Sequence, residues 1–126
     1  MTAGQRKLRR VTIGVAATLT LALVIAVLTL APMPAGGPPG SDKLYHALAF
    51  GALAFPLPLV RPRMAIYVFL CVLVYGGVIE LIQPYFGRSA EWADLWADGL
   101  GAALGATAGA LLSGRVLAAT RRRRDA

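Results

Sequence analysis

Residues 80–101 of this chain read ELIQPYFGRSAEWADLWADGLG, and they lie between two long apolar runs. This stretch holds four of the six acidic residues of the chain, namely Glu80, Glu91, Asp94 and Asp98. It also holds Gln83, Arg88 and both tryptophans. Ionisable groups beside or inside membrane-length segments are costly, and by default they mark a functional site. The stretch therefore predicts a polar site where two membrane helices meet, and the other segments can be placed around it.

The composition indicates that the bilayer is the solvent of this chain. Of its 126 residues, 57% are hydrophobic and only 15% are charged, whereas soluble domains have about 45–50% and about 25%. The net charge of +7 is compatible with nucleic-acid binding. However, the basic residues gather at residues 6–10 and 121–124, beside apolar runs, as membrane-topology signals do. No basic folded face is indicated, so we predict one integral membrane domain and no nucleic-acid partner.

Four apolar segments predict four transmembrane helices and an all-α fold. The first, at about residues 11–31, is uncharged and long enough for a hydrocarbon core of about 30 Å. It exceeds the roughly 7–15 apolar residues of a signal peptide, so we expect a retained helix. Residues 32–40, rich in proline and glycine, predict an irregular linker. The remaining helices are predicted at about residues 43–60, 64–83 and 92–119.

Local signals predict the ends of these helices. Ser41 and Asp42 are good N-caps for the second helix. Pro56 and Pro58 are expected to kink or loosen the far end of that helix. Pro84 is expected to end the third helix.

The distribution of basic residues predicts the orientation in the membrane. If the N-terminus is cytoplasmic, every lysine and arginine except Lys43 and Arg88 lies on the inner side. A bias of this size favours an N-in/C-in topology under the positive-inside rule. The predicted domains are a cytoplasmic basic N-terminus (1–10), a transmembrane domain (11–119) and a cytoplasmic basic C-terminus (120–126).

Small residues recur at every fourth position of the last predicted helix: Ala97, Gly101, Gly105, Gly109 and Ser113. Such spacing lets helix backbones approach closely in lipid. The stripe therefore predicts close packing, either within the fold or in a homo-oligomer through the Gly101/Gly105/Gly109 face. Gly76 and Gly77 are predicted to pack in the same way on the third helix. The single cysteine, Cys71, lies in an apolar run and is predicted to be a small buried hydrophobic residue.

The predicted topology gathers the polar side chains at the outer end of the bundle. Three pairs, spaced three or four residues apart, share a helix face: Asp42 with His46, Glu80 with Gln83, and Asp94 with Asp98. The candidate ligand-binding residues are Lys43, His46, Glu80, Gln83, Arg88, Asp94 and Asp98.

Several short motifs occur in a fixed order between about residues 41 and 109. Asp42-Lys43-Leu44-Tyr45-His46 opens one helix, Glu80-Leu81-Ile82-Gln83 closes the next, and Arg88 and Asp94-Leu95-Trp96-Ala97-Asp98 follow. This ordered set resembles the VanZ-like family of small bacterial membrane proteins. One departure is Asp98, where the family usually has asparagine. The family's namesake is linked to teicoplanin resistance, so the resemblance implies a multi-pass protein of the bacterial plasma membrane with a role at the cell envelope.

Two functional hypotheses involve a ligand. In the first, the site binds an anionic lipid or cell-wall precursor, such as an undecaprenyl-type lipid. Lys43 and Arg88 would hold phosphate, and the carboxylates and Gln83 would contact sugar or amine groups. In the second, the chain is a membrane-embedded hydrolase or transferase. His46, oriented by Asp42, would be the general base, with Glu80 or Asp98 as a second acid or base.

A third hypothesis is purely structural, because buried charges in membrane helices pair with one another. The natural pairs would be Arg88 with Asp94 and His46 with Glu80. Carboxylates outnumber basic groups at this end of the chain, so pairing alone leaves a surplus of them. One imidazole together with several carboxylates would suit a divalent cation, and a metal site is the variant of the enzyme hypothesis. A single histidine offers no pair of ligands at metal-binding spacing, however, so neither a metal nor another cofactor is predicted.

Overall fold

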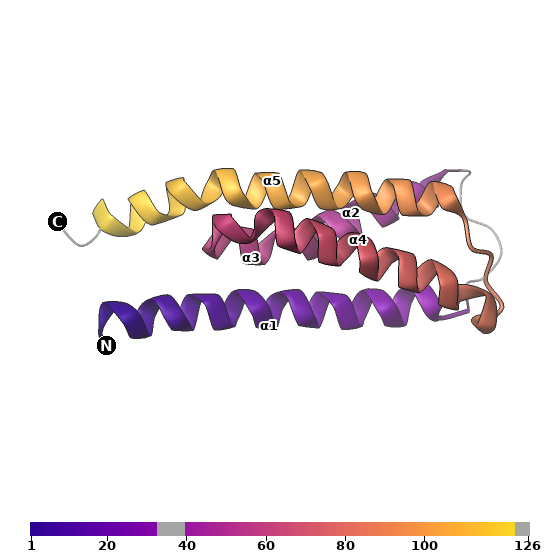
Figure 1. Cartoon of the computed structure of the whole chain (residues 1–126), viewed down its shortest axis with the longest axis horizontal. Coiled ribbons are helices and arrows are strands. Elements are labelled where there is room, and N and C mark those ends of the chain that lie inside the picture. The colour runs from indigo at the N-terminus through magenta and orange to yellow at the C-terminus, as the bar shows by residue number, and fades with distance from the viewer. Residues whose placement is uncertain (33–39, 123–126) are drawn as a thin grey trace.

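The computed structural model describes residues 1–32 and 40–122, and these residues form helices and no strand. Five α-helices make the bundle in Figure 1: α1 (Ala3–Leu30), α2 (Ser41–Ala54), α3 (Pro56–Val60), α4 (Ala65–Ile82) and α5 (Trp92–Arg122). Two short 3₁₀ helices, η1 (Pro62–Met64) and η2 (Gln83–Phe86), precede and follow α4. Most of the predicted linker and the last four residues of the predicted C-terminal tail lie outside the described residues.

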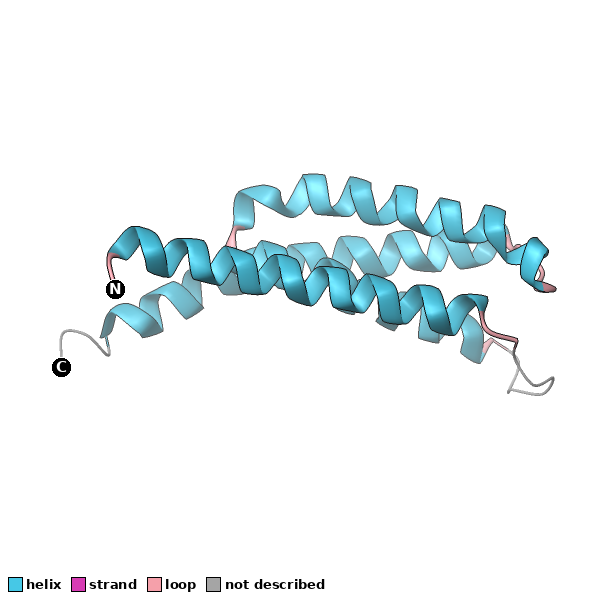
Figure 2. Cartoon of the chain, turned by 90° about the horizontal axis from the view of Figure 1, so that it is seen from below, coloured by secondary structure: helices cyan, strands magenta, loops and turns pink. Residues whose placement is uncertain are grey.

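Among the described residues, four helical stretches are long and apolar enough to cross a membrane: Ala3–Leu30, Ser41–Val60, Pro62–Phe86 and Trp92–Val116. The all-α, four-span prediction is therefore confirmed. α1 begins and α5 ends at the same end of the bundle (Figures 1 and 2), as four spans require. The assignment of that end to the cytoplasm stays a prediction from the basic residues.

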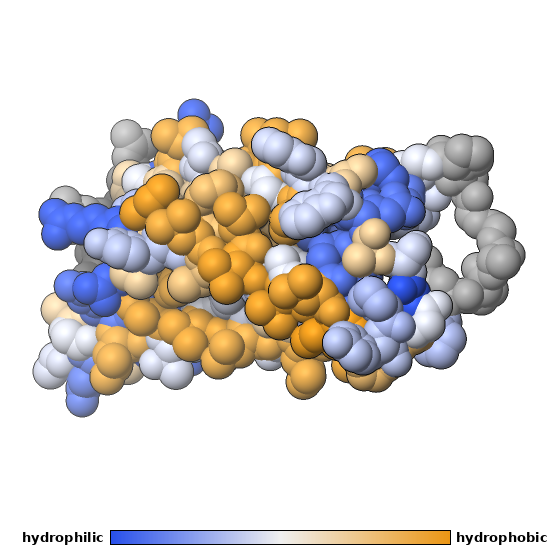
Figure 3. Space-filling view, turned by 45° about the vertical axis from the view of Figure 1, so that its right-hand side comes forward, coloured by the Kyte–Doolittle hydropathy of each residue, from blue (hydrophilic) through white to orange (hydrophobic). Residues whose placement is uncertain are grey.

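The surface matches this membrane placement. Figure 3 shows an apolar band across the middle of one face, with hydrophilic residues toward both ends. Trp92 and Trp96 are about 80% exposed at the start of α5, where indole rings suit the head-group region. Cys71 is exposed on α4, so the prediction that it is buried is wrong. In a membrane helix the exposed side faces lipid, which an apolar residue tolerates as well as a protein core.

α1 begins well before the predicted Val11 because a capping box starts it. The backbone N–H of Gln5 donates to Thr2 Oγ1 at 3.2 Å, and the Thr2 N–H donates to Gln5 Oε1 at 2.7 Å. These two bonds satisfy donors that a helix N-terminus leaves free. The helix therefore includes the basic residues that the sequence placed in a separate tail.

The second span is two helices rather than one. Its N-cap is Gly40, at a φ of 81°, so neither Ser41 nor Asp42 caps it as predicted. α2 ends at Ala54, and α3 begins at Pro56. Proline has no N–H to continue the helical ladder, so the expected break before the end of this span is confirmed.

The end of the third span is also set by proline. α4 ends at Ile82, and Pro84 lies in the 3₁₀ turn that follows. The chain then reverses at Gly87, which has a φ of 72°, a left-handed conformation that glycine adopts at little cost. This turn carries Arg88 back toward the end of α1.

The glycine stripe of α5 packs within the chain, against α2 and α3. A Cβ added to Gly101 would collide with the carbonyl of Ala47, and one added to Gly105 with the carbonyl of Gly51. At Gly109 it would lie 2.5 Å from the carbonyl oxygen of Phe55. The fold therefore already occupies the face that the sequence also offered to a second copy.

The other two predicted packing glycines differ from each other. A Cβ at Gly76 would lie 3.0 Å from both Asp98 Oδ2 and Phe50 Cε1, so this glycine makes room for side chains of α5 and α2. No atom of the described residues lies within 4 Å of a Cβ at Gly77, so the predicted helix packing there is wrong.

α1 lies against the rest of the bundle through a small number of specific contacts. Gly14 packs on α3, where a Cβ would lie 2.7 Å from Val60 Cγ2. The Tyr75 hydroxyl on α4 donates to the backbone carbonyl of Ala22. Because apolar side chains gain little from leaving lipid for a helix interface, such close contacts and hydrogen bonds hold this helix in place.

Candidate functional site

Five polar side chains from four helical elements lie at the end of the bundle opposite the start of α1. His46 comes from α2, Glu80 from α4, Gln83 from the start of η2, and Asp94 and Asp98 from α5. Each is more than nine-tenths buried. The structure therefore brings together five of the seven predicted ligand-binding residues as one cluster, which we call the polar cluster.

His46 and Asp98 form the central contact of the polar cluster. His46 Nδ1 lies 2.8 Å from Asp98 Oδ1, and His46 Nε2 lies 3.7 Å from Asp94 Oδ2. The predictions that Asp42 orients this imidazole and that Glu80 pairs with it are therefore wrong. The close approach of α5 to α2 at Gly101 and Ala47 places Asp98, one turn away, directly against His46.

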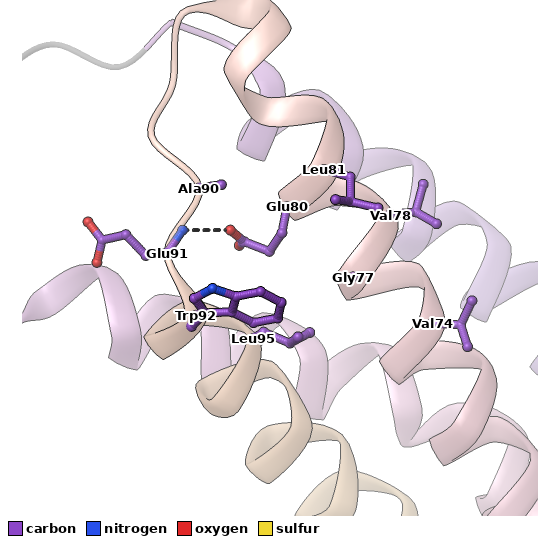
Figure 4. A pocket seen from close by; sticks show the side chains of 9 residues that line it. All are labelled: Val74, Gly77, Val78, Glu80, Leu81, Ala90, Glu91, Trp92 and Leu95. Atoms are coloured by element: carbon purple, nitrogen blue, oxygen red, sulfur yellow. Dashed lines mark hydrogen bonds between the residues drawn. The ribbon is translucent and has the colours of Figure 1, made fainter.

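Glu80 joins the end of α4 to the segment before α5. Its Oε2 accepts the backbone N–H of Glu91 at 2.9 Å, as Figure 4 shows. Gln83, one turn further, donates from Nε2 to the backbone carbonyl of Thr29 at 3.4 Å. These two bonds join α4 to the segment before α5 and η2 to α1, so the polar cluster is held from more than one side.

Lys43 lies at the rim of the polar cluster, among three carboxylates. Its Nζ is 3.3 Å from Asp42 Oδ2, 3.3 Å from Glu91 Oε2 and 3.7 Å from Asp94 Oδ1. The ammonium group is therefore already neutralised within the chain, which counts against the predicted phosphate contact. Glu91 is missing from the predicted set of binding residues because nothing in its spacing assigns it to a helix face.

Arg88 does not pair with Asp94 as the structural hypothesis supposed. Its Nη1 donates to the backbone carbonyl of Ala31 at 3.3 Å, at the C-cap of α1. A helix C-terminus carries partial negative charge and unsatisfied carbonyls, so it attracts a cation. The reversal at Gly87 brings Arg88 to this position.

Two cavities flank the polar cluster. One, of about 280 Å³, lies between α1 and α2, and its polar lining includes Asp42, His46 and Arg88. The other, of about 430 Å³, lies between α4 and α5 and is lined by apolar residues together with Glu80 and Glu91 (Figure 4). The polar cluster is therefore buried, but His46 lines the first cavity and Glu80 lines the second.

Several buried oxygen atoms of the polar cluster lack a hydrogen-bond partner within the described residues: Glu80 Oε1, Gln83 Oε1, Asp94 Oδ1 and Asp98 Oδ2. Buried polar atoms are normally paired, and each exception calls for an explanation. The surplus of acceptors expected from the sequence is thus present in the fold. An arrangement of this kind can accept hydrogen bonds from a ligand or coordinate a cation, and it holds an imidazole in a fixed orientation.

The comparisons with known proteins agree with the resemblance seen in the motifs. Neither a curated protein nor a solved structure matches the chain. The family model described as VanZ/LLP1 matches residues 8–113. This range includes all four candidate spans in whole or large part and every residue of the polar cluster. The chain therefore belongs to the VanZ/LLP1 family of membrane proteins.

Proposed function

We propose that this protein binds the phosphorylated head of a lipid-linked cell-wall precursor, of undecaprenyl type, at the outer face of a bacterial plasma membrane. The observation that carries the proposal is the lining of the cavity between α1 and α2. Arg88, Asp42 and His46 share that cavity with apolar residues of both helices. Such a cavity offers one polar end for a head group and an apolar wall for a chain, as ligand sites commonly do.

Arg88 is the residue we assign to the phosphate. A guanidinium has five N–H donors in a planar fork, and within the described residues one of them, on Nη1, is donated to the carbonyl of Ala31. The remaining donors suit a bidentate contact with phosphate oxygens. We do not assign Lys43 to the phosphate, because its ammonium group already forms ion pairs with Asp42 and Glu91.

Asp42 and His46 are the residues we assign to hydroxyl or amine groups of the ligand. Both line the cavity beside Arg88, and a carboxylate accepts hydrogen bonds from either group. Ile25, Leu28 and Tyr45 form part of the apolar wall along which a lipid chain would lie. Retention of an envelope precursor in this way would alter glycopeptide susceptibility, including susceptibility to teicoplanin.

Native mass spectrometry with added undecaprenyl phosphate tests the proposal. Wild-type protein is expected to retain the lipid, and Arg88→Ala to bind it more weakly. A hydrogen bond to a charged group contributes about 1.5–3 kcal/mol, which corresponds to roughly a 10- to 150-fold increase in Kd. Arg63→Ala, which removes an arginine from η1 at the opposite end of the bundle, is the matched control. Equal retention of the lipid by both folded variants would contradict the proposal.

A second candidate function is hydrolysis or group transfer on a lipid-linked substrate, and one specific observation favours it. Asp98 fixes the imidazole of His46 at 2.8 Å, and His46 lines the same cavity as Arg88. An imidazole oriented by a carboxylate is the usual arrangement of a general base. If this function is correct, His46 accepts a proton from a water molecule that attacks phosphorus, the bond from phosphorus to the lipid oxygen breaks, and wild-type protein releases inorganic phosphate and the lipid alcohol. His46→Gln should bind the lipid without this release. Binding without turnover by wild-type protein would exclude the catalytic reading.

A further inference from the structure

Three potential metal ligands come from three different helices, and one of them, His46, also lines the cavity between α1 and α2. One side-chain ligand atom from each of His46, Glu80 and Asp98 lies within 4.8 Å of the other two, and all three residues are buried. We infer that these residues form a binding site for a divalent transition-metal ion, Zn²⁺ or Mn²⁺. The inference goes beyond the proposed function and does not depend on it.

The unpartnered oxygen atoms carry the inference. Glu80 Oε1 and Asp98 Oδ2 are buried without a hydrogen-bond partner, and their side chains belong to residues only 7% and 1% exposed. Asp98 Oδ2 lies on the α4 side of its carboxylate, 3.0 Å from the Cβ position of Gly76. Glu80 leaves the same helix one turn further along. Both free oxygen atoms therefore belong to the space between α4 and α5.

The charge balance supports a dication. Within residues 1–32 and 40–122, no lysine or arginine forms an ion pair with Glu80 or Asp98. Two carboxylates and a neutral imidazole together match the charge of one divalent ion. Buried carboxylates that lack such a partner are expensive in a low-dielectric interior, so an ion would stabilise the arrangement that the fold imposes.

A comparison with the outer carboxylates strengthens this reading. Asp42, Glu91 and Asp94 also place ligand atoms within 4.8 Å of one another. That group already surrounds a cation, because Lys43 Nζ lies 3.3–3.7 Å from each of the three. The inner group contains the same number of ligands, and among the described residues no ammonium group forms an ion pair with it.

The ligand types and distances fit a transition ion. In a tetrahedral site, ligand atoms about 2.0–2.2 Å from Zn²⁺ lie about 3.3–3.6 Å from one another. The three ligand atoms lie within 4.8 Å of one another, so side-chain rotations that draw them together would close the site. Imidazole suits Zn²⁺ and carboxylate suits Mn²⁺, and a mixed set accepts either ion. Glu80 also lines the cavity between α4 and α5, which provides an entry path and room for a further ligand such as water.

Metal retention by the purified, full-length protein tests the inference. The protein is prepared without a polyhistidine tag, treated with EDTA, loaded with ZnCl₂ or MnCl₂ and separated from free ion. Elemental analysis is expected to find about one ion per folded chain. Glu80→Gln and Asp98→Asn should each weaken binding by more than the roughly 10- to 100-fold that loss of an outer-shell partner costs. Asp42→Asn, in the outer group, is the matched control and should retain the ion.

A spectroscopic measurement on wild-type protein makes the result independent of variant stability. His46 is the only histidine of the chain, so pulsed electron paramagnetic resonance of bound Mn²⁺ should show coupling to one imidazole nitrogen that comes from this residue. Retention of no ion, bound Mn²⁺ without nitrogen coupling, or equal loss of the ion in Asp42→Asn and Asp98→Asn would each overturn the site.

Discussion

Replacement of Gly105 by alanine tests the contact that holds α5 against α2. A Cβ at this position would lie 2.8 Å from the carbonyl carbon of Gly51, and closer still to its oxygen. Ordinary contacts begin at 3.4 Å, so the carbon contact alone requires the helices to separate by about 0.6 Å. A gap of about 0.5–1 Å forfeits a quarter to a half of each dispersion contact across it, and packing is the main attraction between helices in lipid.

The expected net effect is destabilisation of the fold. Insertion of an extra carbon into a well-packed interface typically costs about 1–3 kcal/mol. Alanine is favoured over glycine in a helix by about 1 kcal/mol, which partly offsets that cost in any Gly→Ala variant. Gly77→Ala is the matched control, since it gains the same helix propensity and meets nothing within 4 Å.

Unfolding in mixed detergent micelles, followed by circular dichroism, provides the measurement. Gly77→Ala should be as stable as wild type or more stable by up to about 1 kcal/mol. Gly105→Ala should be less stable than Gly77→Ala by about 1–3 kcal/mol. If the two variants unfold at the same denaturant concentration, the close approach of α2 and α5 is not the contact that stabilises the bundle.

Two further predictions concern α1 and the orientation of the chain. Tyr75→Phe removes the hydrogen bond to the backbone of α1. The variant should lose about 0.5–1.5 kcal/mol of unfolding free energy and show faster hydrogen exchange in α1. Tyr67→Phe, at an exposed position, should change neither quantity, and equal effects of the two variants would contradict the role of this hydrogen bond. In a Cys71→Ser background, Ser89→Cys should react with an impermeant maleimide in intact cells, and Arg63→Cys only after permeabilisation. The opposite labelling pattern would refute the N-in/C-in topology.

The spans follow from the sequence because hydropathy and proline act locally. Long apolar runs predict where helices cross a bilayer, and this signal depends little on what packs beside them. Pro56 broke the second span, and Pro84 ended the α-helical part of the third, as expected. The start of α1 differed, because the capping box at Thr2 extends a helix past the end of its apolar run.

The identity of the polar cluster was also predictable, since helical spacing and alternating topology send its members to one end. His46, Glu80, Gln83, Asp94 and Asp98 are buried together there. The spacing of residues along one helix does not show how that helix is rotated or shifted along its axis relative to its neighbours. The close grouping of His46, Glu80 and Asp98 did not follow from spacing for this reason, because the three residues come from three helices.

The partner of each charge was decided by the tertiary structure alone. The glycines of α5 let its backbone meet that of α2, and this approach sets Asp98 rather than Asp42 beside His46. The turn at Gly87 likewise directs Arg88 to α1 instead of to Asp94. Sequence by itself therefore determined which residues reach the outer end, since that depends on helix length and period. Only the packing of the backbones decided which side chains touch. A hydrogen bond requires its donor and acceptor to lie about 3 Å apart, and a small rotation or shift of one helix against another is enough to exchange one partner for the next.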